Sequence, residues 1–274
     1  MIKFNDEKTA AMKEVEIQYL RIDTGKREHR KDFVTVEEPL HLIINGEHYV
    51  TILLTPIQKR ALAVGHLMTE GIVKSLDQIK EIRINGQTCN ITLHSNVKLQ
   101  ERLALVTPFR RIVTSACATP EEWPLYRLLD RLKTPKITSK ITVDSKTMVE
   151  IARRFSKEAT IHLRTGGVHA AALNRSNGEP IALSEDVGRH NAVDKVVGMA
   201  VEANCKLEET FLMSTGRLTG DVTIKAARVG IPIVASLSAA VYSGIEVAER
   251  TGLTLIGFVR GGRMNIYTHP ERVV

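Results

Sequence analysis

Continuous apolar runs that alternate with helical segments dominate the second half of this 274-residue chain. The runs occupy residues 211–214, 231–236 and 253–259, and helix-forming segments separate them at 221–229 and 243–250. Strands that are apolar at every position are buried on both faces, and helical crossovers make successive strands parallel. The alternation therefore predicts a mostly parallel sheet with helices on both faces, a fold in which ligands bind beyond the carboxyl ends of the strands.

A hairpin with polar segments at its ends lies just upstream of this alternation. Residues 170–173 and 180–183 are the predicted strands, and Asn177-Gly178 is the turn between them. Thr165–His169 precedes the hairpin and Glu185–Asn191 follows it. Glycine lets a backbone approach a ligand closely, and the charged and amide groups can bind one. A solvated turn followed by a helix cap would explain the same residues, and this alternative stays open.

The first half of the chain is patterned as two antiparallel hairpins around one helix. Residues 1–32 are polar, with one short strand expected at 15–22. Alternating apolar residues place the hairpins at 39–55 and 81–93, each with an Asn-Gly turn. Thr55 is expected to cap the helix between them, and Gly71 is expected to end it. This half therefore predicts a small α+β unit.

A segment with the composition of a linker, residues 133–140, separates the two halves. We therefore expect an N-terminal α+β domain over residues 1–136 and an α/β domain over residues 137–274. The second domain is predicted to open with a helix at 144–155, and another helix, at 191–203, follows the polar hairpin.

The charge balance indicates an anionic partner. The formal net charge is +7 at pH 7, which favours a nucleotide, a phosphorylated cofactor, an acidic protein or a nucleic acid. Two segments that follow predicted strands, Ser214–Arg217 and Arg260–Arg263, carry glycine beside arginine, a combination that suits phosphate. Aromatic residues make up only 4%, which leaves few platforms for stacked bases and argues against nucleic acid.

Cysteine usage and hydropathy favour a cytoplasmic protein. Three cysteines at irregular spacing fit a reducing compartment better than a disulfide framework. No run reaches the ~18 apolar residues of a membrane span, and the charged N-terminus lacks the apolar core of a signal peptide. Neither an HExxH motif nor a paired-cysteine motif occurs, so no metal site is expected.

Cys117 is the candidate nucleophile. It lies two residues before Thr119, the expected N-cap of a helix. The unpaired N–H groups and the dipole at a helix N-terminus stabilise a thiolate and lower the pKa of the thiol, and Arg110 and Arg111 can add positive potential. A buried structural cysteine is the alternative, and the residues alone do not decide between the two.

Five motifs taken together resemble the formate dehydrogenase accessory sulfurtransferase family (FdhD type). They occur in the same order between Pro39 and Arg272, and they are TPIQKRALAVGHLMTEGIV, TGGVHAAAL, EDVGRHNAVDK, IPIVASLSA and EVAERTGLTLIGFVRGGRMNIYTHP. The resemblance implies a C-terminal cytidine-deaminase-like α/β/α sheet domain without the deaminase zinc, beside the smaller N-terminal α+β domain. It also implies a homodimer.

The function implied by the resemblance is that of a cytoplasmic sulfur carrier required for formate dehydrogenase activity. In this family a cysteine desulfurase supplies sulfur to a loop cysteine, which holds it as a persulfide. The sulfur then passes to the molybdenum cofactor, bis-molybdopterin guanine dinucleotide, before that cofactor enters the catalytic subunit of formate dehydrogenase. The cofactor would be bound transiently, and guanine nucleotides could mimic it.

Site residues carry over by position. Cys117 matches the persulfide cysteine of the family. The residues that match its cofactor-binding segment and its polar loops, with Arg217 added from the strand-end segment above, are Phe258, Val259, Arg260, Gly261, Gly262, Arg263, Gly166, Gly167, His169, Glu185, Asp186, Arg189, His190, Asn191 and Arg217.

The chain departs from the family pattern beside its candidate nucleophile. Many members carry a CxxC pair, whereas this sequence reads Cys117-Ala-Thr-Pro120. Either Cys117 carries sulfur alone, or the chain is a non-catalytic chaperone that binds and delivers the cofactor. A third interpretation, an RNA-binding or nucleobase-processing protein, is suggested by charge and fold class. Sparse aromatic residues and missing zinc ligands count against it.

Overall fold

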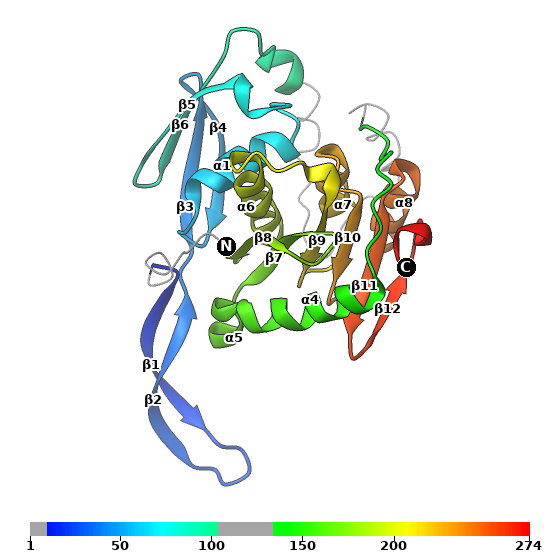
Figure 1. Ribbon diagram of the computed structural model, residues 1–274. Coiled ribbons are helices and arrows are strands. Elements are labelled where there is room, and N and C mark those ends of the chain that lie inside the picture. The colour runs from blue at the N-terminus through cyan, green and yellow to red at the C-terminus, as the bar shows by residue number, and fades with distance from the viewer. Residues whose placement is uncertain (1–9, 104–133) are drawn as a thin grey trace.

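Two stretches of the chain, residues 10–103 and 134–274, are described by the computed structural model (Figure 1). Their strands form three sheets, of two, four and six strands. The predicted Cys117 segment and the helix expected after it lie outside the described residues. Most of the predicted binding residues belong to the six-stranded sheet and its connections.

The six-stranded sheet has the strand order β12-β11-β10-β9-β7-β8. Its strands are β7 (His169–Arg175), β8 (Pro180–Asp186), β9 (Thr210–Ser214), β10 (Ile233–Ser236), β11 (Thr254–Arg260) and β12 (Arg263–Ile266). β9, β10 and β11 are parallel, and the other neighbouring pairs of this sheet are antiparallel. The prediction of a mostly parallel sheet is therefore wrong. Tight turns join β7 to β8 and β11 to β12, and such turns permit only antiparallel pairing.

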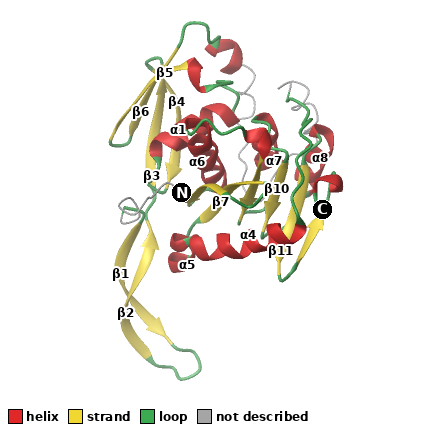
Figure 2. Ribbon diagram, viewed as in Figure 1, coloured by secondary structure: helices red, strands yellow, loops and turns green. Residues whose placement is uncertain are grey.

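Helices cover both faces of this sheet, as expected (Figure 2). α6 (Arg189–Glu202), α7 (Gly220–Arg228) and α8 (Tyr242–Thr251) pack on one face. α4 (Ser145–Glu158) packs on the other, and the short α5 (Thr160–Thr165) follows it. The predicted apolar face of α4 is confirmed by its buried residues, Met148, Ile151, Ala152 and Phe155. The α/β/α layering is present, and its cytidine-deaminase-like topology stays a prediction.

The four-stranded sheet contains both predicted hairpins of the first half. Its order is β4-β3-β6-β5, and its strands are β3 (Glu38–Ile44), β4 (Glu47–Leu54), β5 (Ile79–Asn85) and β6 (Thr88–Leu93). Parallel pairing of β3 with β6 joins the two hairpins. α1 (Lys59–Thr69) packs on this sheet through Leu62 and Leu67, which share a buried cluster with Leu40, Leu42 and Ile91. Short 3₁₀ helices elsewhere are η2 (Leu76–Gln78), η3 (Leu207–Glu209) and η4 (Pro270–Arg272).

The start of α1 differs from the prediction. α1 begins at Lys59 after Gln58, which has a left-handed backbone (φ 54°), and Thr55 does not cap it. Instead the Thr55 N–H donates to Asp186 Oδ2 at 3.2 Å, and the Thr55 hydroxyl accepts the Val187 N–H at 3.1 Å. The Asp186 carboxylate and the Val187 N–H at the end of β8 therefore take the two groups of Thr55 that a local cap would use.

α1 and α6 cross backbone to backbone, which joins the four-stranded sheet to the six-stranded one. A Cβ atom added to Gly65 would lie 1.7 Å from the carbonyl oxygen of Asp194, and one added to Gly198 would lie 1.9 Å from that of Ala61. Both glycines are therefore required by the close approach of the two helices. The domain boundary expected between residues 136 and 137 stays a prediction.

A two-stranded ribbon projects from the rest of the molecule (Figure 1). It consists of β1 (Met12–Leu20) and β2 (Arg27–Thr35), of which the sequence analysis expected only the first. The ribbon is anchored at its base, where the Thr35 and Thr165 hydroxyls lie 2.9 Å apart and the Arg164 guanidinium stacks 3.5 Å from the centre of the Phe33 ring. Its base thus lies beside α5, close to the predicted polar segments.

Candidate functional site

One edge of the six-stranded sheet gathers the predicted binding segments (Figure 1). β9, β10 and β11 are parallel, so their carboxyl ends share this edge. β7 runs against β9 and therefore begins there with His169, and β8 ends there with Asp186, which is paired with His169. The first turns of α6, α7 and α8 follow the ends of β8, β9 and β10. Segments that are far apart in the sequence thus meet at a single edge.

The loops at this edge are bonded to one another. The Leu237 N–H donates to Ser214 O at 3.0 Å, and the Ser236 hydroxyl donates to Gly216 O at 2.7 Å, which ties the end of β10 to the end of β9. The Phe258 N–H donates to Ser238 O at 2.9 Å, which ties β11 to the segment after β10. The edge is therefore a preorganised surface in which neighbouring loops fix each other.

Basic side chains surround His169 at this edge. We define the basic cluster as His162 on α5, His169 on β7, Arg189 and His190 on α6, and Arg217 after β9. Burial lowers the pKa of His169 most, and the positive charges of Arg189, His162, His190 and Arg217 lower it further. A lowered pKa favours the neutral form of the His169 imidazole, whereas the guanidinium groups of Arg189 and Arg217 stay charged.

Two members of the basic cluster converge on one carboxylate oxygen. His190 Nε2 lies 2.7 Å from Asp221 Oδ2, although its N–H falls outside hydrogen-bond geometry, and Arg189 Nη2 lies 3.9 Å from the same oxygen. Burial alone would raise the pKa of Asp221. The contact with His190, the Thr219 hydroxyl and the charge of Arg189 instead hold it well below its usual range. Asp221 is therefore an anion inside an otherwise positive environment.

Glu185 and Asp186 are buried and are used by the fold. The Glu185 carboxylate accepts the Ile161 and His162 N–H groups at 3.2 and 2.7 Å, which binds the start of α5. Asp186 forms a fully buried ion pair with Lys195, with Nζ 2.6 Å from Oδ2. The expected cap of the helix that follows is absent, because α6 begins after Gly188 without a side-chain cap hydrogen bond, and Glu185 binds the start of α5 instead. The contacts of both acids fix the elements that carry the predicted binding residues.

Asn191 and the predicted glycine pair also have structural contacts. Asn191 Nδ2 donates to Leu53 O at 2.7 Å and to Asp186 Oδ1 at 2.8 Å. Gly166 ends α5 with a left-handed backbone (φ 63°), and a Cβ atom on Gly167 would lie 2.7 Å from Thr35 Oγ1. The glycine pair is therefore explained by the joint between α5 and the ribbon, without a ligand.

The predicted segment from Phe258 to Arg263 forms the hairpin turn between β11 and β12. Gly261 and Gly262 have positive φ values of 61° and 75°, and Arg260 pairs with Arg263 across the turn. Val259 is buried in the core, whereas both arginines are exposed. Three strand spacings of about 4.8 Å, or roughly 14 Å, separate β11 from β7. The edge thus carries two separate basic groups, the basic cluster and this arginine turn.

The sequence analysis missed two residues that shape the basic cluster. Asp221 was assigned only to the start of a helix, and Gly216 was considered only as a glycine beside Arg217 that suits phosphate, not as a neighbour of Arg189. A Cβ atom on Gly216 would lie 3.0 Å from Arg189 Cβ and 3.3 Å from its Cδ, so this glycine makes room for the arginine stem. Asp221 is an acidic residue in the first turn of α7, and α6 begins with the basic residues Arg189 and His190. This combination could have indicated that they pair.

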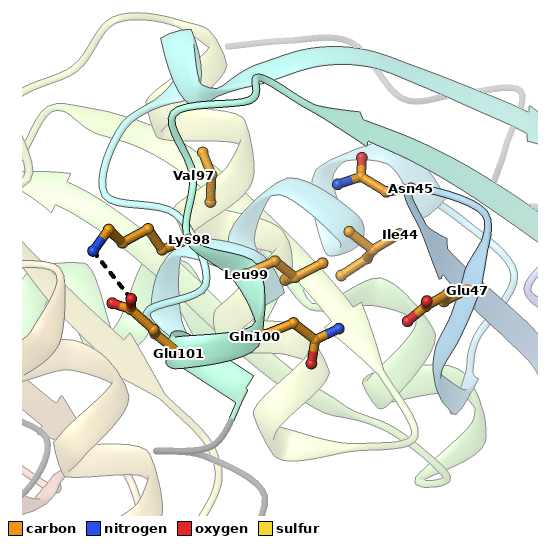
Figure 3. Close-up of a pocket in the computed structure, with 8 residues that line it drawn as sticks. All are labelled: Ile44, Asn45, Glu47, Val97, Lys98, Leu99, Gln100 and Glu101. Atoms are coloured by element: carbon orange, nitrogen blue, oxygen red, sulfur yellow. Dashed lines mark hydrogen bonds and ion pairs between the residues drawn. The ribbon is translucent and has the colours of Figure 1, made fainter.

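A pocket of about 440 Å³ lies elsewhere, against the four-stranded sheet (Figure 3). Its lining residues are Ile44, Asn45, Glu47, Val97, Lys98, Leu99, Gln100 and Glu101. Lys98 and Glu101 pair with each other at 3.0 Å on its rim. None of the predicted binding residues lines this pocket, so it is not the candidate site.

The structure tests the cysteines only in part, because Cys117 lies outside the described residues. Cys89 is buried in the core of the four-stranded sheet, and burial raises the pKa of its thiol to about 11. Cys205 is partly exposed after α6. Cys89 is therefore unsuited to nucleophilic chemistry. No helix in the described stretches is both long and apolar enough to cross a membrane.

Fold and edge together define a class: an α/β/α protein that presents basic side chains along one edge of its central sheet. Comparison with solved structures supports this fold. A crystal structure from Desulfotalea psychrophila, described as a candidate formate dehydrogenase accessory protein, superposes with a TM-score of 0.75 at 24% sequence identity. The match covers 96% of this chain and 100% of that one.

Sequence comparison identifies the family. A family model described as the FdhD/NarQ family matches residues 35–274. The sulfur carrier protein FdhD of Thermoplasma acidophilum is 35% identical over 279 residues, which span 100% of this chain and 97% of that protein. The sulfur carrier protein FdhD of Sulfolobus acidocaldarius is 33% identical over 259 residues, which span 94% and 97%. The chain belongs to the FdhD/NarQ family.

Proposed function

We propose that this chain is a sulfur carrier for the maturation of formate dehydrogenase. It accepts sulfur from a cysteine desulfurase as a persulfide on Cys117. It then transfers the sulfur to bis-molybdopterin guanine dinucleotide, in the cytoplasm, before that cofactor enters the formate dehydrogenase catalytic subunit. The observation that carries the proposal is the basic sheet edge, found in a member of a family whose relatives are named sulfur carriers.

The sulfur step requires only one nucleophile on this chain. The Cys117 thiolate attacks the outer sulfur of a persulfide on the desulfurase, a new S–S bond forms, and the donor cysteine leaves as a thiolate. Electrons and atoms balance without an added oxidant or reductant. In onward transfer the reduced cofactor, as substrate, would supply the electron pair that bonds to the outer sulfur and would be oxidised by two electrons, while Cys117 would leave as a thiolate with the S–S bonding pair. A second cysteine is therefore not needed for the sulfur to pass, in agreement with Cys117-Ala-Thr-Pro120.

The basic edge fits the charge of the cargo. Arg189 and Arg217 in the basic cluster, and Arg260 and Arg263 at the arginine turn, are the side chains that would bind its phosphate groups, because arginine forms paired hydrogen bonds with phosphate. Neutral His169 can donate one hydrogen bond and accept another. Two basic groups on one edge suit a ligand with phosphates at two places. We also propose that the protein acts as a homodimer.

Mass spectrometry of the intact protein tests the sulfur step. After incubation with a cysteine desulfurase and cysteine, the wild-type chain should gain 32 Da, the mass of about one sulfur atom, and Cys117→Ala should not. Cys205→Ala, which removes the partly exposed cysteine, is the matched control and should still gain sulfur. An adduct that persists in Cys117→Ala would refute the assignment of the persulfide to this residue.

A non-catalytic cofactor chaperone is the second candidate function. The missing second cysteine of the family pattern favours it, since proline stands at that position. The same experiment separates the two: absence of any adduct in the wild type, together with intact binding of guanine nucleotide, would support the chaperone.

A further inference from the structure

Asp221 faces the basic cluster from the first turn of α7. It is the carboxylate that the described residues bring against both Arg189 and His190, with Oδ2 at 3.9 and 2.7 Å from their nitrogens. Its other oxygen, Oδ1, accepts the Val222 N–H at 2.9 Å and the Thr219 hydroxyl. One oxygen is therefore held by its own helix, and the other is directed at the cations.

The contact on the cationic side is incomplete. Arg189 Nε is buried and has no hydrogen-bond partner among the described residues, and Nη2 lies beyond hydrogen-bond distance of Asp221. A guanidinium has five N–H donors, and leaving a buried donor unpaired is unfavourable. Asp221 thus offsets the charge of Arg189 but does not accept a hydrogen bond from its guanidinium group. A phosphate group, with several acceptor oxygens, could do both.

The three side chains are placed so that a ligand can reach them. Their exposed fractions are 25% for Arg189, 27% for His190 and 33% for Asp221. Gly216 lets the arginine stem lie against the β9 loop, which holds the guanidinium near the edge. Arg189 Nε and His190 Nε2 are themselves buried, so a competing anion would meet the exposed parts of these side chains first and would reach the two nitrogens as the side chains turn toward it.

We propose that Asp221 is an internal counter-ion of the cofactor site, which holds Arg189 and His190 in the free protein and yields them to a phosphate group of the ligand. The inference rests on the proposed function, which gives the basic cluster an anionic cargo. Exchange of one anion for another makes net binding weaker than the same cations would give without Asp221. A carrier that must release its ligand benefits from this weaker binding.

Calorimetric titration of the full chain tests this role. Inorganic pyrophosphate probes the anion exchange, and guanosine diphosphate probes the nucleotide site of the proposed function. Asp221→Asn should bind pyrophosphate about three- to tenfold more tightly than the wild type, because it removes the competing charge. Glu81→Gln makes the same change in charge at an exposed surface pair with Arg83 and should leave the affinity nearly unchanged. Arg189→Gln should weaken binding.

Two outcomes would overturn the proposal, and a third would support it while rejecting the nucleotide site. Equal or weaker pyrophosphate binding by Asp221→Asn, with weakened binding by Arg189→Gln, would make Asp221 a residue that only positions the cations. Failure of both the wild type and Asp221→Asn to bind pyrophosphate would also reject it. Tighter pyrophosphate binding by the variant without any binding of guanosine diphosphate would support the counter-ion and reject the nucleotide site instead. If Asp221→Asn does not fold, Asp221→Ser, whose hydroxyl oxygen can still accept a backbone N–H at the start of α7, replaces it.

Discussion

At the scale of single residues, the two acids that the sequence marks as candidates for ligand binding instead stabilise the fold. Glu185 and Asp186 stand beside glycine and histidine, yet both carboxylates are buried and bonded to the chain's own donors. The sequence cannot distinguish these roles, because the donors come from residues as distant as Thr55. Asp221, which faces the basic cluster, has no histidine neighbour in the sequence, and only its place at the start of a helix could have indicated its role.

Lys195→Met should destabilise the fold strongly. Lys195 and Asp186 are fully buried, and removal of one partner leaves an uncompensated buried charge at a cost of about 3–5 kcal/mol. Urea denaturation would measure this loss in the free energy of unfolding. The double variant Lys195→Met/Asp186→Leu should recover part of it. Equal stability of the single variant and the wild type would show that the pair is not a structural element.

Glu70 should make the free energy of unfolding depend on pH in the acid range. Burial alone would raise its pKa, but the charges of Lys225 and His66 hold it well below the usual range, and Lys225 Nζ lies 2.8 Å from Oε1. A carboxyl with a lowered folded pKa stabilises above its unfolded pKa of about 4.3 and loses that contribution as the pH falls further. The pKa of Lys225 is raised, so its contribution is constant across the acid range.

Denaturation midpoints at pH 7 and pH 3 would test this pH dependence. Glu70→Gln should be less stable than the wild type at pH 7 and should lose less stability between the two values. Glu81→Gln, at an exposed pair, should follow the wild type. A wild-type and a Glu70→Gln profile of the same shape would contradict the assignment.

At the scale of elements, the sequence predicted turns and helix ends where the residues that form them are neighbours in the chain. Asp144 caps α4 by accepting the Thr147 N–H at 2.9 Å, at the start of the helix predicted over 144–155, and Gly252 ends α8 with φ 76°, just after the helix predicted over 243–250. Asn45-Gly46 forms a turn with two positive φ values, 51° and 88°. The second strand of the ribbon was missed because both strands are polar and their periodicity is weak. Cross-strand ion pairs such as Lys31 with Glu14 contribute to the pairing.

The crossing of α1 and α6 gives a prediction at this scale. Gly198→Ala places a methyl group 1.9 Å from Ala61 O, so the helices must separate. We expect a loss of at least about 1–3 kcal/mol in the free energy of unfolding, the usual cost of overpacking. Thermal or urea unfolding measures it. Glu150→Ala, at an exposed position of α4, is the helical control and should change stability by less than about 0.5 kcal/mol. A neutral Gly198→Ala would disprove the tight crossing.

At the scale of the whole molecule, the layers follow from the sequence but the sheet order does not. Apolar runs and amphipathic helices are enough to predict helices on both faces. The order β12-β11-β10-β9-β7-β8 depends on which distant segments pair, and no local pattern encodes it. That order nevertheless matters for the proposed function, because it brings His169, Arg189, Arg217 and the arginine turn to one edge. Their membership of one binding site stays a prediction, and their spacing came only from the structure.

Formate dehydrogenase activity in a host that lacks its own sulfur carrier tests the central claim most directly. Expression of this chain should restore activity, Cys205→Ala should restore it equally, and Cys117→Ala should leave it near the level of the empty host. Western blotting should show all three proteins at similar abundance. Full restoration by Cys117→Ala would contradict sulfur transfer through that residue and leave the chain as a cofactor chaperone.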